Sequence, residues 1–230
     1  MLIIPVIDIR NAQVVHARCG KRDDYRPLHT ALCHNSDPLE LVHAYLSLYP
    51  FTEIYLADLD AIEQTGQNDA VVTSLHNHFS ELTFWLDAGN NIADDLHSLE
   101  RLRPVIGTET GVTSQQLACH TGHDSKPILS LDFLGSNLKG DDSLLENTKS
   151  WPEDVIVMSL QRVGSGHGPD LDLLSYIQSI AAEKNLFMAG GIRSEHDLDE
   201  LCSRGVTGVL LASALHNNKI SVETLNKYRA

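Results

Sequence analysis

Short runs of β-branched and apolar residues recur along the chain, and most are followed by a segment whose apolar positions repeat with helical spacing. A short apolar run bounded by turn-forming residues is typical of a strand buried in a parallel sheet. We expect strands at residues 2–8, 53–58, 82–87, 104–108, 128–132, 154–159, 186–189 and 206–212. We expect helices at residues 38–48, 69–79, 92–102, 170–183, 194–203 and 221–228.

The alternation of eight expected strands with mostly helical segments over 230 residues favours a closed parallel barrel. A doubly wound open sheet is the alternative. It normally carries a glycine-rich turn after its first strand, whereas here that strand ends in Asp8-Ile9-Arg10-Asn11. No stretch resembles an interdomain linker. We therefore predict an α/β fold in which residues 1–230 form a single (β/α)8 TIM barrel.

A weak internal repeat supports the barrel. The pair Ile7-Asp8 recurs as Leu131-Asp132, and Ala88-Gly89 recurs as the start of residues 189–191 (AGG). A barrel built of two half-barrel repeats would show this pattern, with equivalent residues at the ends of its first and fifth strands.

Net charge restricts the partners. The formal charge of -14 disfavours nucleic acid and anionic lipid, although backbone N–H groups can still bind a small phosphorylated substrate. No apolar run approaches the ~18 residues of a membrane span. The N-terminus lacks the basic region of a signal peptide, so we expect a cytoplasmic protein.

Cysteine and histidine spacing gives little support for a metal. The four cysteines form no CxxC pair and are expected to be free thiols. His76 and His78 do not share a helix face, and Gly122 argues against a helix that would bring His120 and His123 together. We therefore expect neither a metal nor another cofactor.

Polar residues at the ends of the strands are the candidates for chemistry, because barrels of this type hold their sites there. A carboxylate at the mouth is partly desolvated, which suits a general acid or base. Asp8 and Asp132, on opposed strands, can divide these roles, although such residues can also cap helices or bind loop amides. Their equivalent places in the two halves favour catalysis. The other polar strand ends are Asp58, Asp87, Thr108 and Ser159.

Glycines and hydroxyls after the later strands indicate a phosphate site. Gly190 and Gly191 follow the seventh strand and Ser213 follows the eighth, where barrels often bind phosphate. Glycines can alternatively serve only a tight turn. The matching positions in the first half are Gly89, Gly107 and Thr108.

The glycine-rich loop after the sixth strand adds four candidates. Arg162 can bind a phosphate or carboxylate, with Gly164 and Ser165 beside it. His167 can titrate near neutral pH and would then be catalytic, although a histidine among glycines is more often only solvated.

Several motifs resemble the histidine-biosynthesis barrels, namely the ProFAR isomerase and the cyclase subunit of imidazole glycerol phosphate synthase (the HisA/HisF superfamily). The resemblance covers essentially the whole chain. Its motifs are residues 4–8 (IPVID), 21–25 (KRDDY), 55–60 (YLADLD), 189–193 (AGGIR) and 211–215 (LASAL). Further motifs resemble a divergent branch found in methanogens and in methylotrophs that use tetrahydromethanopterin: residues 57–62 (ADLDAI), 87–89 (DAG), 107–110 (GTET), 130–132 (SLD) and 162–169 (RVGSGHGP).

The resemblance implies catalytic roles for Asp8 and Asp132 and phosphate binding in the glycine loops of both halves. The chain also departs from the family pattern. Val163 stands where the isomerases keep their second acid–base aspartate, so His167 or Asp132 would have to replace it. The family usually has three consecutive glycines in the phosphate loop of its first half-barrel, whereas residues 88–90 read AGN here. Ala212 stands where the family usually has a glycine after the last strand.

Three functions remain open from the sequence. The first is an isomerase, or an enzyme of a related reaction, that acts on a phosphoribosyl-type sugar phosphate. The second is a divergent paralogue in tetrahydromethanopterin- or methanofuran-linked one-carbon metabolism with a different substrate. The third is a non-catalytic barrel that binds a phosphorylated metabolite.

Overall fold

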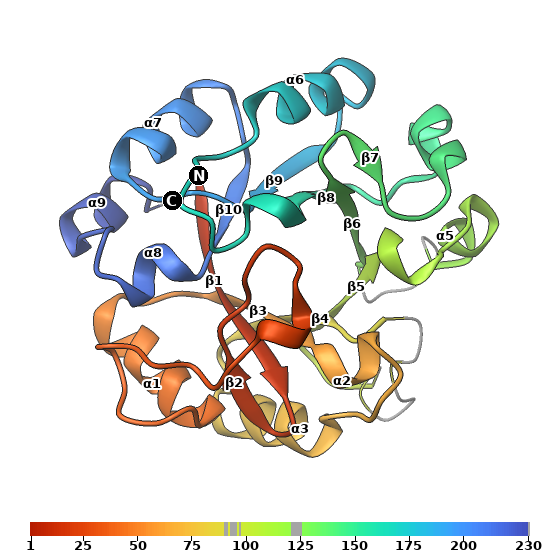
Figure 1. The fold of residues 1–230 in the computed structure, drawn as a ribbon. Coiled ribbons are helices and arrows are strands. Elements are labelled where there is room, and N and C mark those ends of the chain that lie inside the picture. The colour runs from red at the N-terminus through yellow and green to blue at the C-terminus, as the bar shows by residue number, and fades with distance from the viewer. Residues whose placement is uncertain (90–91, 93–95, 97, 121–125, 230) are drawn as a thin grey trace.

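Eight parallel strands close into a barrel in the computed structural model, which describes residues 1–89, 92, 96, 98–120 and 126–229 (Figure 1). Neighbouring strands pair in chain order, and the last strand pairs with the first, with Leu2 opposite Gly208. The predicted (β/α)8 fold is therefore confirmed. The barrel strands are β1 (Leu2–Arg10), β3 (Glu53–Asp58), β4 (Thr83–Asp87), β5 (Leu102–Gly107), β6 (Ile128–Leu134), β8 (Asp154–Ser159), β9 (Asn185–Ala189) and β10 (Gly208–Leu211).

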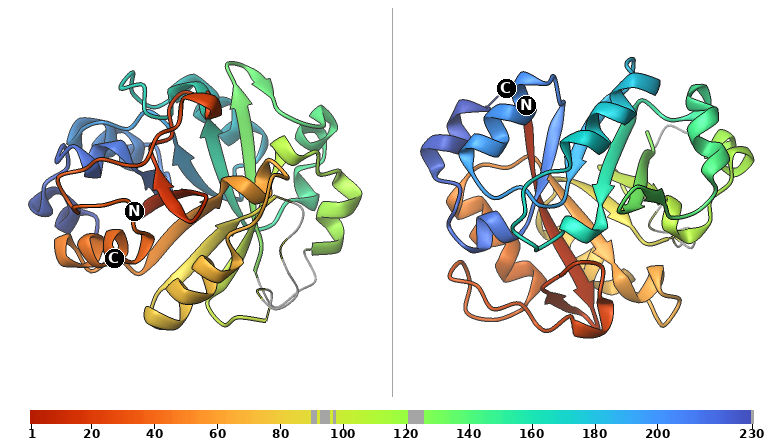
Figure 2. Two further views of the ribbon diagram at one scale, coloured as in Figure 1. Left: turned by 60° about the horizontal axis from the view of Figure 1, so that its bottom comes forward. Right: turned by 45° about the horizontal axis from the view of Figure 1, so that its top comes forward.

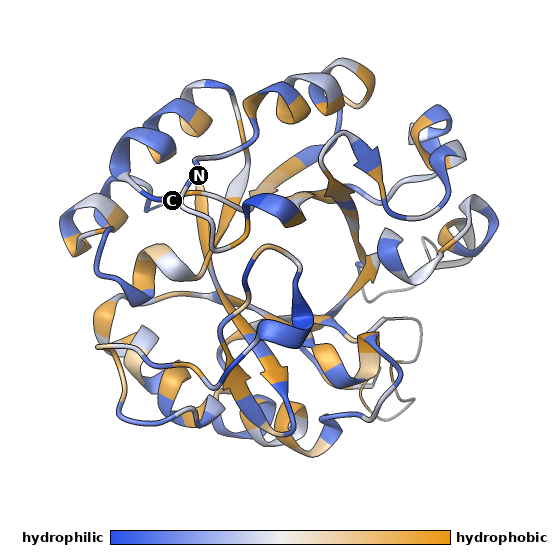
Figure 3. Cartoon of the chain, in the orientation of Figure 1, coloured by the Kyte–Doolittle hydropathy of each residue, from blue (hydrophilic) through white to orange (hydrophobic). Residues whose placement is uncertain are grey.

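Helices surround the sheet and present their apolar sides to it (Figures 2 and 3). Side-chain oxygens of Asp37, Asp170, Ser194 and Ser221 accept hydrogen bonds from the first turns of four of them, which fixes where these helices begin. The outer helices are α1 (Pro38–Leu48), α3 (Asp69–His78), α5 (Ser114–His120), α6 (Leu171–Ile180), α7 (Glu195–Ser203) and α9 (Val222–Lys227). Two short helices, α2 (Leu59–Ile62) and α8 (Ser213–His216), directly follow barrel strands.

The barrel interior is packed below its mouth. Trp85 and Phe187 meet edge to face with ring centroids 4.9 Å apart, and Ile4 is fully buried in the same cluster. Successive strand residues point to opposite faces, so the inward row that begins at Ile4 continues through Val6 to Asp8. The strand pattern therefore carries Asp8 from the packed interior up to the mouth.

Some predicted boundaries were wrong. The strand ending at Asp8 continues to Arg10 and turns back into β2 (Gln13–Val15), and β6 likewise pairs with β7 (Asn137–Leu138). The expected helix 92–102 lies partly outside the described residues. Residues 98–101 form turns and Leu102 begins β5, because its pairing with Phe84 aligns β5 with β4. The last strand covers only Gly208–Leu211 of the expected 206–212.

In the part of the chain that the structure describes, none of the helices combines the length and apolar character needed to cross a bilayer.

Candidate active site

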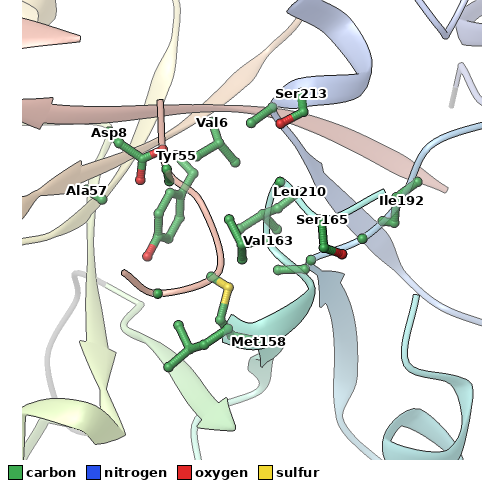
Figure 4. A pocket seen from close by; sticks show the side chains of 18 of the residues that line it. Val6, Asp8, Tyr55, Ala57, Met158, Val163, Ser165, Ile192, Leu210 and Ser213 are labelled. Carbon is green, nitrogen blue, oxygen red and sulfur yellow. The ribbon is translucent and has the colours of Figure 1, made fainter. Parts of the chain in front are cut away.

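A cavity of about 540 Å³ opens at the carboxyl ends of the barrel strands. Apolar side chains form part of its wall, and Figure 4 shows Val6, Met158 and Leu210 among them. Its polar residues form two groups on opposite sides of the cavity. Asp8 and Tyr55 lie on one side, and Ser165 and Ser213 lie on the other (Figure 4). A cavity of this size accommodates a small metabolite.

Asp8 faces this cavity from the first barrel strand. Burial raises the pKa of its carboxyl group to about 7, and the negative charge of Asp87 adds to the rise, while the positive charge of Arg22 opposes it. Asp8 is half-buried, and it lines the cavity. A carboxyl group with this pKa is partly ionised at neutral pH and can accept a proton.

Asp132 faces the same cavity from the fifth barrel strand, β6. Its Oδ1 accepts a hydrogen bond from the hydroxyl of Ser130 at 2.7 Å, and its Oδ2 accepts one from the backbone N–H of Glu109 at 3.1 Å. Burial nevertheless raises the pKa of Asp132 to about 8, with further contributions from the charges of Glu109 and Asp87. At neutral pH this group is largely protonated and can donate a proton.

Asp87, at the end of β4, is a third carboxylate in the cavity. Burial and the charge of Glu109 raise its pKa to about 6. Its Oδ2 accepts a hydrogen bond from the Tyr55 hydroxyl at 2.9 Å, and its Oδ1 accepts one from the N–H of Gly89 at 3.2 Å. The sequence placed Asp87 at a strand end but did not select it for the site.

The loop after β2 lies over the barrel mouth and carries η1 (Arg22–Asp24) (Figures 1 and 2). The N–H of Cys19 donates to the carbonyl of Val163, which ties this loop to the loop after β8. Arg22 lines the cavity and donates to Glu109 at 2.5 Å. Sequence reasoning missed Arg22 and Glu109 as site residues. The signals were that Arg22 belongs to the KRDDY motif and Glu109 to the GTET motif, but neither motif shows that its side chain reaches the cavity.

The other side of the cavity is formed by Gly164, Ser165, Gly190, Gly191 and Ser213, all predicted for phosphate binding. These loops need glycine for two reasons: their backbone adopts positive φ values, and a side chain would not fit against the neighbouring loop. A Cβ atom on Gly191 would lie 2.2 Å from a carbonyl oxygen of the neighbouring loop. The structure thus brings these predicted residues together.

Two basic side chains, Arg193 and Lys219, also line this side of the cavity, and both are exposed. The sequence analysis predicted neither residue for the site. Arg193 is already paired with Asp197 through its Nε at 3.1 Å.

Five predicted site residues do not line the cavity: Gly89, Gly107, Thr108, Arg162 and His167. Arg162 instead pairs with Asp170 at 3.1 Å, and His167 is exposed on its loop. Thr108 is fully buried beside Asp132, to whose N–H its hydroxyl oxygen is bound at 2.9 Å.

Asp58, another strand-end candidate, has a structural role. Its carboxylate accepts from the N–H of Ala61 at 3.1 Å and from the N–H and side-chain amide of Asn68, both at 2.6 Å. We expect Asp58→Ala to lower the free energy of unfolding by about 2 kcal/mol, because buried donors lose their acceptor. Urea denaturation measures this change. An equal loss in the control Asp23→Ala, at an exposed position, would contradict the assignment.

Among the residues whose placement is described, no group of three or more His, Cys, Asp or Glu side chains could hold a metal ion. The carboxylates of Asp87 and Asp132 are instead hydrogen-bonded to the hydroxyls of Tyr55 and Ser130.

Comparison with known proteins gives a consistent result. Residues 2–221 match the family model described as "Histidine biosynthesis protein". An uncharacterized protein of Methanocaldococcus jannaschii is 30% identical, with 99% of each chain covered. A 1-(5-phosphoribosyl)-5-((5-phosphoribosylamino)methylideneamino) imidazole-4-carboxamide isomerase of Cenarchaeum symbiosum is 23% identical, covering 97% of this chain and 98% of that protein. An isomerase of the same name from Thermus thermophilus is 26% identical, covering 97% of each.

Proposed function

The chain belongs to the histidine biosynthesis protein family, and we propose that it is an enzyme that isomerises a phosphoribosyl-type sugar phosphate or catalyses a closely related reaction. The observation that carries this proposal is the presence of Asp8 and Asp132 in one cavity, with pKa values of about 7 and about 8. Two carboxyl groups with different protonation states suit acid–base chemistry better than passive binding of an anion. The isomerase names of several relatives support the same reaction class.

The roles follow from the protonation states. In a substrate that carries an amine at its first carbon, protonated Asp132 donates to the ring oxygen of the sugar, and the nitrogen lone pair opens the ring and leaves an iminium group at that carbon. Ionised Asp8 then removes the proton from the adjacent carbon, and the same carboxyl group returns a proton to the first carbon as the resulting enaminol becomes the 1-aminoketose. Asp132 takes the acid role that the sequence left open between Asp132 and His167, because His167 is outside the cavity lining.

The phosphate of the substrate would bind opposite these carboxylates. The N–H groups of Gly191 and Ile192 donate to no other described residue, and both residues line the cavity. The hydroxyls of Ser165 and Ser213 lie on the same side (Figure 4), although Ser165 donates to the carbonyl of Arg162 at 2.8 Å and the Ser213 hydroxyl lies 3.2 Å from Nε2 of His16. Unpaired backbone N–H donors of this kind hold phosphate without a dedicated cation.

The proposed roles predict a bell-shaped dependence of kcat/KM on pH. The base Asp8 must be deprotonated, so the rate rises as pH approaches about 7, and the acid Asp132 must be protonated, so the rate falls above about 8. Initial rates measured across this range would test it. We expect Asp132→Asn to lose the alkaline limb of the profile together with most of the activity. An unchanged alkaline limb in this variant would exclude Asp132 as the acid.

A direct assay tests the proposed reaction. Ribose 5-phosphate mixed with an excess of ammonium salt forms the aldosylamine, whose conversion to the aminoketose can be followed by NMR. We expect the protein to accelerate this conversion. A folded protein that binds ribose 5-phosphate but leaves the conversion at the uncatalysed rate would contradict the proposal.

A divergent paralogue in one-carbon cofactor metabolism is the second candidate. Val163 lines the cavity and cannot transfer a proton, and the M. jannaschii relative, which is 30% identical, is uncharacterized. Expression in a strain lacking ProFAR isomerase separates the candidates. Growth without histidine would support the histidine-pathway reaction, and no growth from soluble protein would support the paralogue.

A further inference from the structure

The cavity has opposite electrostatic character on its two sides. Asp8, Asp87, Glu109 and Asp132 all line one side, where Arg22 is the nearby cation. Arg22 is already neutralised, because it pairs with Glu109 at 2.5 Å and lies 3.6 Å from Glu63. This side therefore carries several carboxylates and no unpaired positive charge among the described residues that line it.

Two described hydrogen-bond donors at the place of a first-half phosphate are already used by protein carboxylates. The N–H of Gly89 donates to Asp87, and the N–H of Glu109 donates to Asp132. Gly107 leaves room for a carboxylate, because a Cβ atom there would lie 3.2 Å from Oδ2 of Asp132 and 3.6 Å from Oδ2 of Asp87. Gly89 and Gly107, in the first half of the barrel, thus bind or make room for carboxylates of the protein itself.

The opposite side offers donors and positive charge. Gly191 and Ser213 lie there, and the side chains of Arg193 and Lys219 stand at its rim. Arg193 is partly neutralised by Asp197, while Lys219 forms no ion pair with the residues that the structure describes. An anionic group is favoured on this side alone.

We propose that the substrate carries a single phosphate, bound beside Gly191 and Ser213, and presents an amine or a similar N–H donor to Asp87. This inference rests on the proposed function and defines its substrate class. A second phosphate on the carboxylate side would face the negative charge of Asp87, which is largely ionised at neutral pH, and of partly ionised Asp8, which is unfavourable. An ammonium or N–H group there would instead form charge-assisted hydrogen bonds.

Three ligands that differ only at carbon 1 test the proposal: fructose 6-phosphate, its 1-amino-1-deoxy analogue and fructose 1,6-bisphosphate. Affinities are measured by calorimetry with the full chain. We expect the amino analogue to bind about ten-fold more tightly than fructose 6-phosphate, as one charge-assisted hydrogen bond would give. We expect the bisphosphate to bind no more tightly than the monophosphate.

Asp87→Asn keeps the shape of the side chain and removes its charge. We expect this variant to bind the amino analogue and fructose 6-phosphate with similar affinity. The control Lys219→Met should weaken all three ligands alike, because it removes charge only from the phosphate side.

The outcomes separate this inference from the proposed function. Tighter binding of the bisphosphate by the unaltered protein, or equal binding of the amino analogue and fructose 6-phosphate, would overturn the inference and leave a sugar-phosphate enzyme intact. No binding of any of the three ligands, nor of ribose 5-phosphate, would overturn both.

Discussion

Replacement of Asp8 by asparagine is expected to lower kcat by about a thousand-fold, a typical loss when a general base is removed. Asparagine has nearly the same shape but cannot accept the substrate proton. Burial already raises the pKa of Asp8 to about 7, which means that its ionised form is disfavoured in the folded protein. Removing that charge should therefore not lower stability. Steady-state kinetics and urea denaturation of the same preparation measure both effects.

Asp87→Asn is the matched control, because it removes a neighbouring carboxylate from the same cavity. Asp87 acts on Asp8 through its charge and on the substrate amine through binding, so we expect Asp87→Asn to change kcat by less than about ten-fold, corresponding to one pKa unit, and to act mainly on KM. Comparable losses of kcat in the two variants would contradict the assignment of Asp8 as the base. A normal kcat in Asp8→Asn would contradict it outright.

Gly191→Ala is expected to have the largest effect on stability. The residue has a φ of +84°, and a Cβ atom would lie 2.2 Å from the carbonyl oxygen of Gly168. The two segments cannot simply separate, since the N–H of Gly168 donates to the carbonyl of Gly191 at 3.1 Å. We expect the free energy of unfolding to fall by about 4 kcal/mol, combining backbone strain with overpacking. Fructose 6-phosphate should also bind at least about ten-fold more weakly.

Gly205→Ala separates the two causes. Gly205 has a φ of +75°, but a Cβ atom there would meet nothing within 4 Å. Its loss of stability should be about 1 kcal/mol, from the backbone conformation alone. If Gly191→Ala were no more destabilising than this control, the close approach of the two loops would not exist in solution.

The barrel could be predicted from the sequence because its signals are local. Apolar strands of nearly uniform length alternate with capped helices, and caps such as Asp37-Pro38 fix the start of a helix from a few residues. The errors lie where tertiary pairing overrides local pattern. Leu102 continues a helical repeat in the sequence, but its pairing with Phe84 makes it the first residue of β5.

The candidate site was predicted in part for the same reason. The strand ends located Asp8 and Asp132, and the glycine loops located Gly191 and Ser213. Arg22 was missed because nothing local shows that its loop lies over the mouth.

Gly89 and Thr108 were assigned to phosphate because the sequence cannot show where a donor is directed. The structure shows that the N–H of Gly89 and the hydroxyl of Thr108 are taken up by Asp87 and Asp132. Hydrogen-bond partners far apart in the chain thus decide which predicted residues remain available to a ligand.

Transfer of solvent deuterium to the substrate tests the central claim most directly. The protein is incubated in D2O with the 1-amino-1-deoxy analogue of fructose 6-phosphate, and the label at the carbon beside the carbonyl is measured by mass spectrometry. We predict incorporation with the unaltered protein and none above background with Asp8→Asn. No incorporation by folded protein that binds this ligand, or equal incorporation by the variant, would contradict acid–base catalysis by Asp8.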